Sequence, residues 1–216
     1  MELDPAALPQ ADRYKLLIGG IVPRPIALVS TASPDGRLNL APFSFFAGVG
    51  SDPMTLLFCP ANNEDGSEKD TLRNAKGTDE GGTGEFVVST VSEAMGARMS
   101  AAAEALPYGE SEFELSGLTP APSRVVAPPR VLEAGVSFEC RTMRVIRTNP
   151  GVGAGGNVVL GMVVHVWVRD ELIDARHRID PTGLDAIARM GGPEYCRSRD
   201  RFTLARGRAA LDGLPR

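Results

Sequence analysis

The side chains that could do chemistry in this chain are mainly hydroxyls, amides and a lysine. The set comprises Ser30, Thr31, Asn39, Ser44, Lys69 and Thr71. These groups exchange hydrogen bonds and can hold an anion such as phosphate, while Phe45 and Phe46 can cover an apolar ring face. Each also has an ordinary structural interpretation, because Ser and Thr often stand at turns and aromatic residues dominate cores. The set is therefore a candidate ligand site.

Histidine and cysteine usage argues against several other chemistries. His165 and His177 are the two histidines and stand twelve residues apart, so the chain has no H-E-x-x-H motif and no histidine cluster. Cys59, Cys140 and Cys196 are an odd number at wide spacing, which argues against a disulfide framework and a thiolate zinc site. We therefore expect no metal ligands, and an enzyme built on this chain must work with little histidine.

Length and charge narrow the class of protein. The chain has 216 residues, with 23 Lys and Arg against 27 Asp and Glu, a formal net charge of −4. That length fits one domain, and a mild acidic excess argues against a nucleic-acid partner. The longest apolar run, 158–168, is too short to span a bilayer. Because the first residues lack the basic and apolar segments of a signal peptide, we expect a cytoplasmic protein without membrane association.

Short β-rich runs separated by turn residues dominate the pattern. Residues 26–31 and 38–46 flank Pro34-Asp35-Gly36. This arrangement predicts a hairpin, because Asp and Gly accept turn dihedral angles that other residues resist. Further strands are predicted at 54–59, 85–90, 136–141 and 158–168. Six or more strands with two or three helices favour an antiparallel β-barrel or α+β fold over a doubly wound sheet.

The helices are predicted from their capping residues. Ser67 opens a capping-box pattern with Asp70, which predicts a helix through Asn74. Ser92 is a candidate N-cap for an alanine-rich helix over 92–105. A third, short helix is expected near 184–190, after Asp180 and Pro181.

Residues 151–156 match the glycine pattern of a dinucleotide-binding motif, and Asp174 follows at about the expected distance. That motif requires a helix that begins within the glycines, so that its N–H groups meet the pyrophosphate. Here the glycines lead into Val158-Val159-Leu160, a β-branched run. We therefore interpret 151–156 as a hairpin loop.

Two consecutive stretches resemble a known family. Residues 24–31, Arg-Pro-Ile-Ala-Leu-Val-Ser-Thr, and 36–46, Gly-Arg-Leu-Asn-Leu-Ala-Pro-Phe-Ser-Phe-Phe, are similar to the flavin reductase-like family of FMN-binding split barrels. Further landmarks agree: Lys69-Asp70-Thr71, Glu85-Phe86-Val87, Ser111-Glu112-Phe113, and Arg189 through Tyr195. The resemblance covers about residues 13–197 of a single domain, which leaves 198–216 as a C-terminal extension.

The resemblance implies a fold and a set of cofactor-binding residues. The fold is a mainly β, FMN-binding split β-barrel, antiparallel and of Greek-key type, with peripheral helices. The implied cofactor-binding residues are Ser30, Thr31, Arg37, Asn39, Ala41, Pro42, Ser44, Phe45, Lys69, Asp70, Thr71, Arg189 and Tyr195. The chain departs from the pattern at 60–68, which has no arginine where related proteins often place a basic residue near the flavin phosphate. The loop 77–84 is also longer than usual.

The resemblance further implies an FMN-dependent oxidoreductase, and we expect an NAD(P)H:flavin reductase in which hydride passes from the nicotinamide C4 to flavin N5. Two alternatives stay open, a flavoredoxin-like electron carrier and a split barrel that binds FMN without turnover. The implied partners are a second copy of the chain, with the flavin site near the dimer interface, and an oxygenase or redox protein. This chemistry belongs to the cofactor, so few catalytic side chains are needed.

Overall fold

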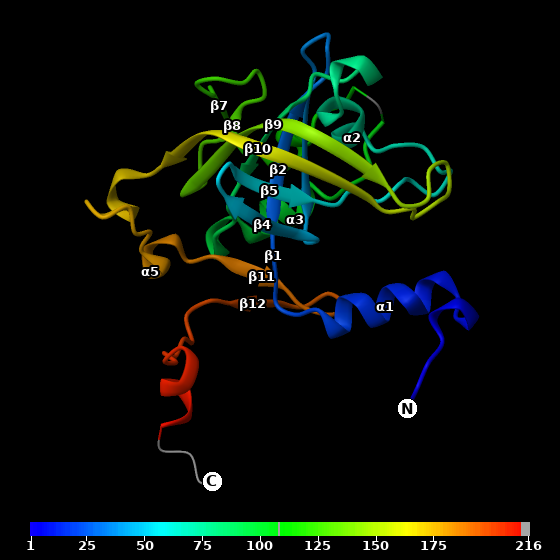
Figure 1. Ribbon diagram of the computed structural model, residues 1–216. Coiled ribbons are helices and arrows are strands. Elements are labelled where there is room, and N and C mark those ends of the chain that lie inside the picture. Colours follow the sequence, from blue (N-terminus) through cyan, green and yellow to red (C-terminus); the bar gives the residue numbers. More distant parts are fainter. Residues whose placement is uncertain (108, 213–216) are drawn as a thin grey trace.

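The computed structural model describes residues 1–107 and 109–212, and its main unit is a seven-stranded antiparallel sheet in the order β3-β2-β6-β9-β10-β5-β4 (Figure 1). Its strands are β2 (Ala27–Ala32), β3 (Leu38–Phe43), β4 (Phe46–Ser51), β5 (Met54–Phe58), β6 (Glu85–Ser89), β9 (Val136–Arg147) and β10 (Asn157–Val168). The edge strands β3 and β4 are separated along the chain by Ser44 and Phe45 alone. The sheet must therefore curl until its two edges meet, which gives a barrel with an open seam and confirms the antiparallel, mainly β fold.

Smaller elements surround this barrel. The remaining strands are β1 (Arg24–Pro25), β11 (Ile187–Arg189) and β12 (Tyr195–Arg197), which form a three-stranded sheet, and the pair β7 (Pro120–Ala121) and β8 (Arg130–Val131). The α-helices are α1 (Gln10–Gly20), α2 (Asp70–Ala75), α3 (Gly96–Ala101), α4 (Glu112–Ser116) and α5 (Pro181–Leu184). Short 3-10 helices span Pro5–Ala7, Thr78–Glu80, Glu93–Met95, Asp170–Leu172 and Gly207–Leu211. None of the helices in the described part of the chain is long and apolar enough to cross a membrane.

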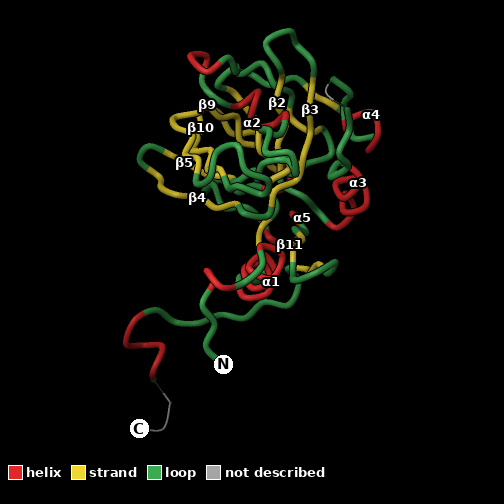
Figure 2. Tube along the Cα trace, turned by 90° about the vertical axis from the view of Figure 1, so that its right-hand side faces the viewer, coloured by secondary structure: helices red, strands yellow, loops and turns green. Residues whose placement is uncertain are grey.

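Helix α1 and the three-stranded sheet lie together on one side of the barrel, and residues 198–212 extend away from that side (Figures 1 and 2). The sequence patterns did not predict α1. Tyr14, Leu17 and Ile18 do have the i, i+3, i+4 spacing of an apolar helix face, but none of the residues of α1 is buried.

The predicted hairpins are confirmed. Strands β2 and β3 pair antiparallel across the Pro34-Asp35-Gly36 turn, with Thr31 opposite Asn39. Gly36 has a φ of +85°, a conformation that suits glycine. Residues 151–156 join β9 to β10, so the glycine run is a hairpin loop as expected.

The helix boundaries differ from the predicted ones. Helix α2 begins at Asp70, with Lys69 at the N-cap and no side-chain cap bond, so the Ser67 capping box was wrong. Ser67 instead bonds Asp65 within its own loop. The region after Ser92 is a 3-10 turn followed by α3, and the chain tightens to i→i+3 bonds after 101.

The third predicted helix was placed too late in the chain. Asp180 does cap a helix, accepting bonds from the N–H groups of Thr182 and Gly183, but α5 ends at Leu184. Residues 187–189 form β11 instead, because they pair with β1 on one side and β12 on the other. A strand partner more than 160 residues away therefore overrides the local pattern.

Strand β2 is buried on both faces and separates two cores. The core that contains Ala27 and Val29 draws on six strands of the barrel and on α2: Ala27, Val29, Phe43, Leu56, Phe58, Leu72, Ala75, Phe86, Val88, Cys140 and Val159. The other core lies between the sheet, α3 and α4: Ile26, Leu28, Leu40, Val91, Met95, Met99, Ala102, Phe113, Leu118, Val131 and Ala134. Because side chains alternate along a strand, Thr31 continues the first face and Ser30 the second.

Candidate functional site: a cleft between β3 and α2

A cavity of about 470 Å³ opens where the corner between β3 and β4 meets the start of α2 and residues 102–106. This volume lies within the range of small-molecule sites. Eight of the thirteen residues implied by the resemblance line it: Asn39, Ala41, Pro42, Ser44, Phe45, Lys69, Asp70 and Thr71. We call this cavity the β3–α2 cleft. Its walls combine hydroxyl, amide and charged groups with apolar surface.

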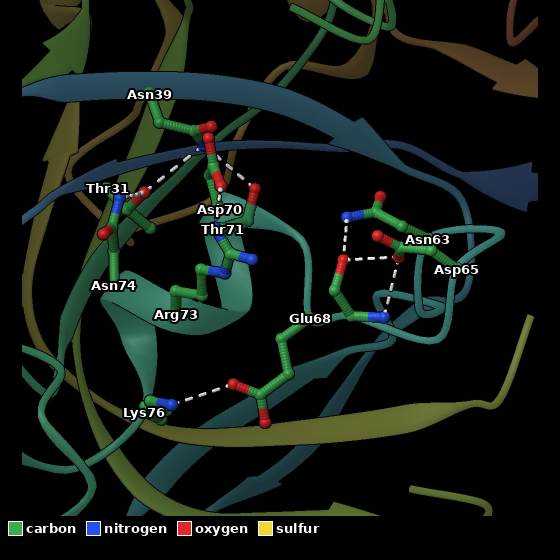
Figure 3. Close-up of polar contacts among 11 residues, drawn as sticks. Thr31, Asn39, Asn63, Asp65, Glu68, Asp70, Thr71, Arg73, Asn74 and Lys76 are labelled. Atoms are coloured by element: carbon green, nitrogen blue, oxygen red, sulfur yellow. Dashed lines mark hydrogen bonds and ion pairs between the residues drawn. The ribbon is translucent and has the colours of Figure 1, made fainter. Parts of the chain in front are cut away.

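A buried hydrogen-bond network lies at the floor of the cleft (Figure 3). The Asn39 side-chain amide donates to Thr71 Oγ1 at 2.9 Å and to Thr31 Oγ1 at 3.3 Å, and the Asn74 amide donates to Thr31 Oγ1 at 3.0 Å. Thr31 does not line the cleft but stands behind Asn39, its partner across the β2–β3 ladder. Because Thr71 Oγ1 accepts from Asn39, its own proton remains available to a ligand.

Two cations reach the cleft from α2. Lys69 precedes the first residue of the helix, and Arg73 follows four residues later on the same face. Arg73 also pairs with Asp70 at 3.4 Å. The start of α2 thus brings two basic side chains to the cleft, whereas 60–68 has no arginine. Arg73 was not predicted as a site residue, although its spacing of four residues from Lys69 was a usable signal.

Two carboxyl groups lie beside these cations. Glu112, on α4, is 7% exposed, and its Oε2 accepts a bond of 2.8 Å from the Leu40 N–H. Burial raises the pKa of Glu112, and the charge of Asp70 adds to that rise. Burial also raises the pKa of Asp70, against the opposing charges of Arg73 and Lys69. The cleft therefore holds acids that take up protons more readily than exposed carboxyls do.

Other lining residues were also missed. Tyr14 comes from α1, Cys59 from the end of β5, and Asn63 from the following loop. Burial raises the pKa of the Cys59 thiol, which disfavours its thiolate form at neutral pH. Within residues 1–107 and 109–212, no group of three or more His, Cys, Asp or Glu is placed to hold a metal ion.

The loop that leads to Lys69 is held at two points. Asn62 donates to Val152 O at 3.0 Å, which ties the loop to the β9–β10 turn. Glu68 pairs with Lys76 at 2.9 Å and with Arg147 at 2.8 Å. Burial opposes ionisation of Glu68, but these two cations hold its pKa below the ordinary value. Lys69 therefore follows an anchored residue, which limits its backbone motion at the cleft.

The other residues implied by the resemblance lie outside the lining of the cleft. Ser30 donates to Pro129 O on the opposite face of β2, and Arg37 is an exposed residue paired with Asp35 at 2.6 Å. Arg189 and Tyr195 contact each other, with the guanidinium 4.6 Å from the ring centroid. Tyr195 lines a different cavity of about 320 Å³, between α3 and β12. A role for these residues in cofactor binding stays a prediction.

Comparison with known proteins places this geometry in a family. Residues 19–183 match the model of the flavin reductase like domain. The structure resembles nitrilotriacetate monooxygenase component B from Bacillus cereus, with a TM-score of 0.87 and 35% identity over 94% of this chain and 98% of that one. It also resembles 2-nitrobenzoate 2-nitroreductase from Pseudomonas fluorescens, with a TM-score of 0.83 and 30% identity over 100% and 99%.

A third structure bears on the fold alone. A Shewanella frigidimarina protein with the split barrel domain of a flavin reductase has a TM-score of 0.79 and 20% identity, over 96% of this chain and 100% of that one. The curled sheet with its open seam between β3 and β4 is thus a split barrel, as predicted. The match covers all seven strands of the barrel and every described lining residue of the cleft except Tyr14, and the chain belongs to the flavin reductase-like domain family.

Proposed function

We propose that the β3–α2 cleft binds FMN and that the chain is an NAD(P)H-dependent flavin reductase. The observation that carries this proposal is the make-up of the cleft. Lys69, Arg73 and the Thr71 hydroxyl all line it from the start of α2, and such groups suit a dianionic phosphate. A single cavity that brings cations and polar groups together with apolar surface fits a phosphorylated, ring-bearing cofactor.

The second part of the fit concerns the ring of the cofactor. Asn39 and Ser44 can satisfy its polar edge, since each lines the cleft with hydrogen-bonding capacity to spare. Ala41, Pro42 and Phe45 offer apolar surface to its face. When bound, FMN supplies a ring that accepts hydride from a nicotinamide. The chain itself contributes binding, orientation and partial exclusion of water, which explains why no catalytic triad or metal cluster is required.

The visible spectrum of the purified protein tests this proposal. We expect added FMN to bind and its absorption band to shift, and NADH or NADPH to bleach that band without oxygen and to be consumed repeatedly in air. Bound flavin that nicotinamide cannot reduce, but that exchanges electrons with a redox protein, would favour the electron-carrier alternative. Failure to bind any flavin would overturn the proposal.

We also propose a partner oxygenase that receives the reduced flavin. Support comes from the likeness to a monooxygenase component, at 35% identity over nearly the whole chain. A second candidate is direct reduction of a small nitroaromatic compound in the same cleft, favoured by the likeness to a nitroreductase. Assays with 2-nitrobenzoate and NAD(P)H separate the two, since a component that supplies free reduced flavin needs no nitro substrate for turnover.

We further propose a homodimer in which α1 contributes to the interface. Among the exposed apolar side chains of this helix, Tyr14 is 51%, Leu16 48% and Leu17 50% exposed. A helix of 11 residues is marginal in water when it buries so little. Tyr14 also lines the cleft, so an interface at α1 would lie beside the flavin site.

A further inference from the structure

Arg24 is a buried cation between the cleft and the N-terminal helix. Its side chain is 3% exposed and does not line the β3–α2 cleft. One terminal nitrogen donates to the carbonyls of Ile18 at 2.5 Å and Ile21 at 2.7 Å, and the other donates to Met190 O at 2.9 Å. These carbonyls belong to the end of α1 and the residue after β11. The guanidinium is therefore fixed where the N-terminal helix meets the C-terminal strands.

The charge of Arg24 is matched by carbonyl groups, because no carboxylate in the described part of the chain lies within ion-pair distance of it. Carbonyls at the C-terminal end of a helix carry partial negative charge and favour a cation there. Burial lowers the pKa of Arg24, Tyr14 opposes this and Arg189 adds to it. A guanidinium nevertheless stays charged throughout the physiological range.

The Nε–H donor of Arg24 faces the wall of the cleft. Its Nε lies 3.3 Å from Ser44 Oγ, and its guanidinium carbon lies 5.9 Å from the centroid of the Phe45 ring. Ser44 and Phe45 are the two residues between β3 and β4, and both line the cleft. Arg24 thus touches the corner of the barrel from behind, while a ligand would touch it from the front.

The contact has a consequence for the Ser44 hydroxyl. A hydroxyl has one proton and two lone pairs, and here a lone pair is engaged by a cation. No acceptor among residues 1–107 and 109–212 takes the Ser44 proton. A hydroxyl that accepts from a charged donor becomes a stronger donor itself. Its proton is therefore available to an acceptor in the cleft.

We propose that Arg24 is a positioning residue that orients and polarises the Ser44 hydroxyl as a hydrogen-bond donor to the bound flavin ring, an inference that rests on the proposed FMN site. Arg24 also binds the carbonyls of Ile18, Ile21 and Met190. These contacts fix the guanidinium and thereby the position of Ser44 in the cleft wall. Arg24 acts from behind Ser44 without touching the ligand.

A double-mutant cycle on the full-length protein tests this role. FMN dissociation constants and visible difference spectra are measured for wild type, Arg24→Met, Ser44→Ala and the double variant. We expect Ser44→Ala and Arg24→Met each to weaken FMN about 5- to 30-fold, the effect of losing one hydrogen bond of about 1–2 kcal/mol. In the Ser44→Ala background, Arg24→Met should cost less than about twofold. Both single variants should shift the flavin band in the same direction, a readout that a general loss of stability would not give.

Arg24→Lys provides a second cycle if Arg24→Met fails to fold. Lysine keeps the positive charge but has no Nε–H, so this variant should retain contacts to carbonyls and still lose most of the coupling to Ser44. Equal effects of the Arg24 substitutions in both backgrounds, with FMN bound by the wild type, would overturn this inference alone. Absence of FMN binding by the wild type would overturn the proposed function, and this inference with it.

Discussion

At the scale of single residues, replacing a cation at the start of α2 should distinguish binding of the FMN phosphate from binding of the flavin ring. Lys69→Ala removes one charge-assisted contact, worth about 1.5–3 kcal/mol, so FMN affinity should fall roughly 10- to 150-fold. Riboflavin, which lacks the phosphate, should bind almost as before. Fluorescence titration with both ligands measures the difference. Lys15→Ala is the matched control, because Lys15 is exposed on α1 and pairs with Asp12.

If Lys69→Ala weakened the binding of FMN and riboflavin equally, or weakened neither, Lys69 would not be a phosphate-binding residue. Arg73 would then be the cation to replace, because it also lines the cleft. Arg37, another cation implied by the resemblance, is already paired with Asp35 outside the lining.

The buried carboxyl group of Glu112 should make the free energy of unfolding depend on pH. Burial raises its pKa in the folded state, so the folded chain still holds a proton at pH values where the unfolded chain has released it. The contribution of this group is therefore most favourable in acid and is lost as pH rises through the raised pKa. Glu112→Gln keeps an oxygen for the Leu40 N–H and should raise the melting temperature above neutral pH, with little effect in acid.

Melting curves across a pH series measure this effect, and Glu114→Gln is the control. Glu114 lies on the same short helix but is exposed. If both substitutions move the melting temperature alike, net charge rather than burial of Glu112 would be the cause.

At the scale of elements, the loop 60–68 depends on close packing against the β9–β10 turn. Gly66 has a φ of +83°, and a Cβ there would lie 2.2 Å from Gly151 O. Gly36 has a φ of +85° with no atom within 4 Å of such a Cβ. Gly36→Ala should therefore cost only the backbone strain, about 1–2 kcal/mol, while Gly66→Ala should cost more and also weaken FMN binding. Chemical denaturation and FMN titration of both variants provide the comparison. Equal losses would mean that the loop yields without disturbing Lys69.

The elements that could be predicted from sequence are those whose signals are local. The β2–β3 hairpin follows from strand-like runs around a turn, and both signals lie within twenty residues. Strand β11 could not be found this way, because its identity depends on pairing with Arg24 and Pro25. Likewise, Glu112 and Tyr14 reach the cleft from elements far from β3 in sequence. Eight of the thirteen candidate residues line the cleft, and the side chains that tertiary packing brings to it were not among the candidates.

At the scale of the whole molecule, the exposed apolar surface of α1 predicts a dimer. We expect light scattering at micromolar concentration to give twice the chain mass of 22.9 kDa. Replacing Leu16 and Leu17 by Glu should shift the mass toward one chain, because it places charge on apolar positions of the proposed interface. A strictly monomeric wild type that still binds FMN would contradict an interface beside the flavin site.

The position of β2 between two cores has a consequence for how the molecule opens. Leu28 belongs to one core and Val29 to the other, and both are fully buried. If either core loosens, β2 loses the packing on one of its faces. The strand can then no longer support the core on its other face. The barrel and its outer layer of α3 and α4 should therefore unfold as one cooperative unit. The amide protons of Leu28, Val29 and Ser30 should exchange with deuterium only through global unfolding, and α1 should exchange long before them.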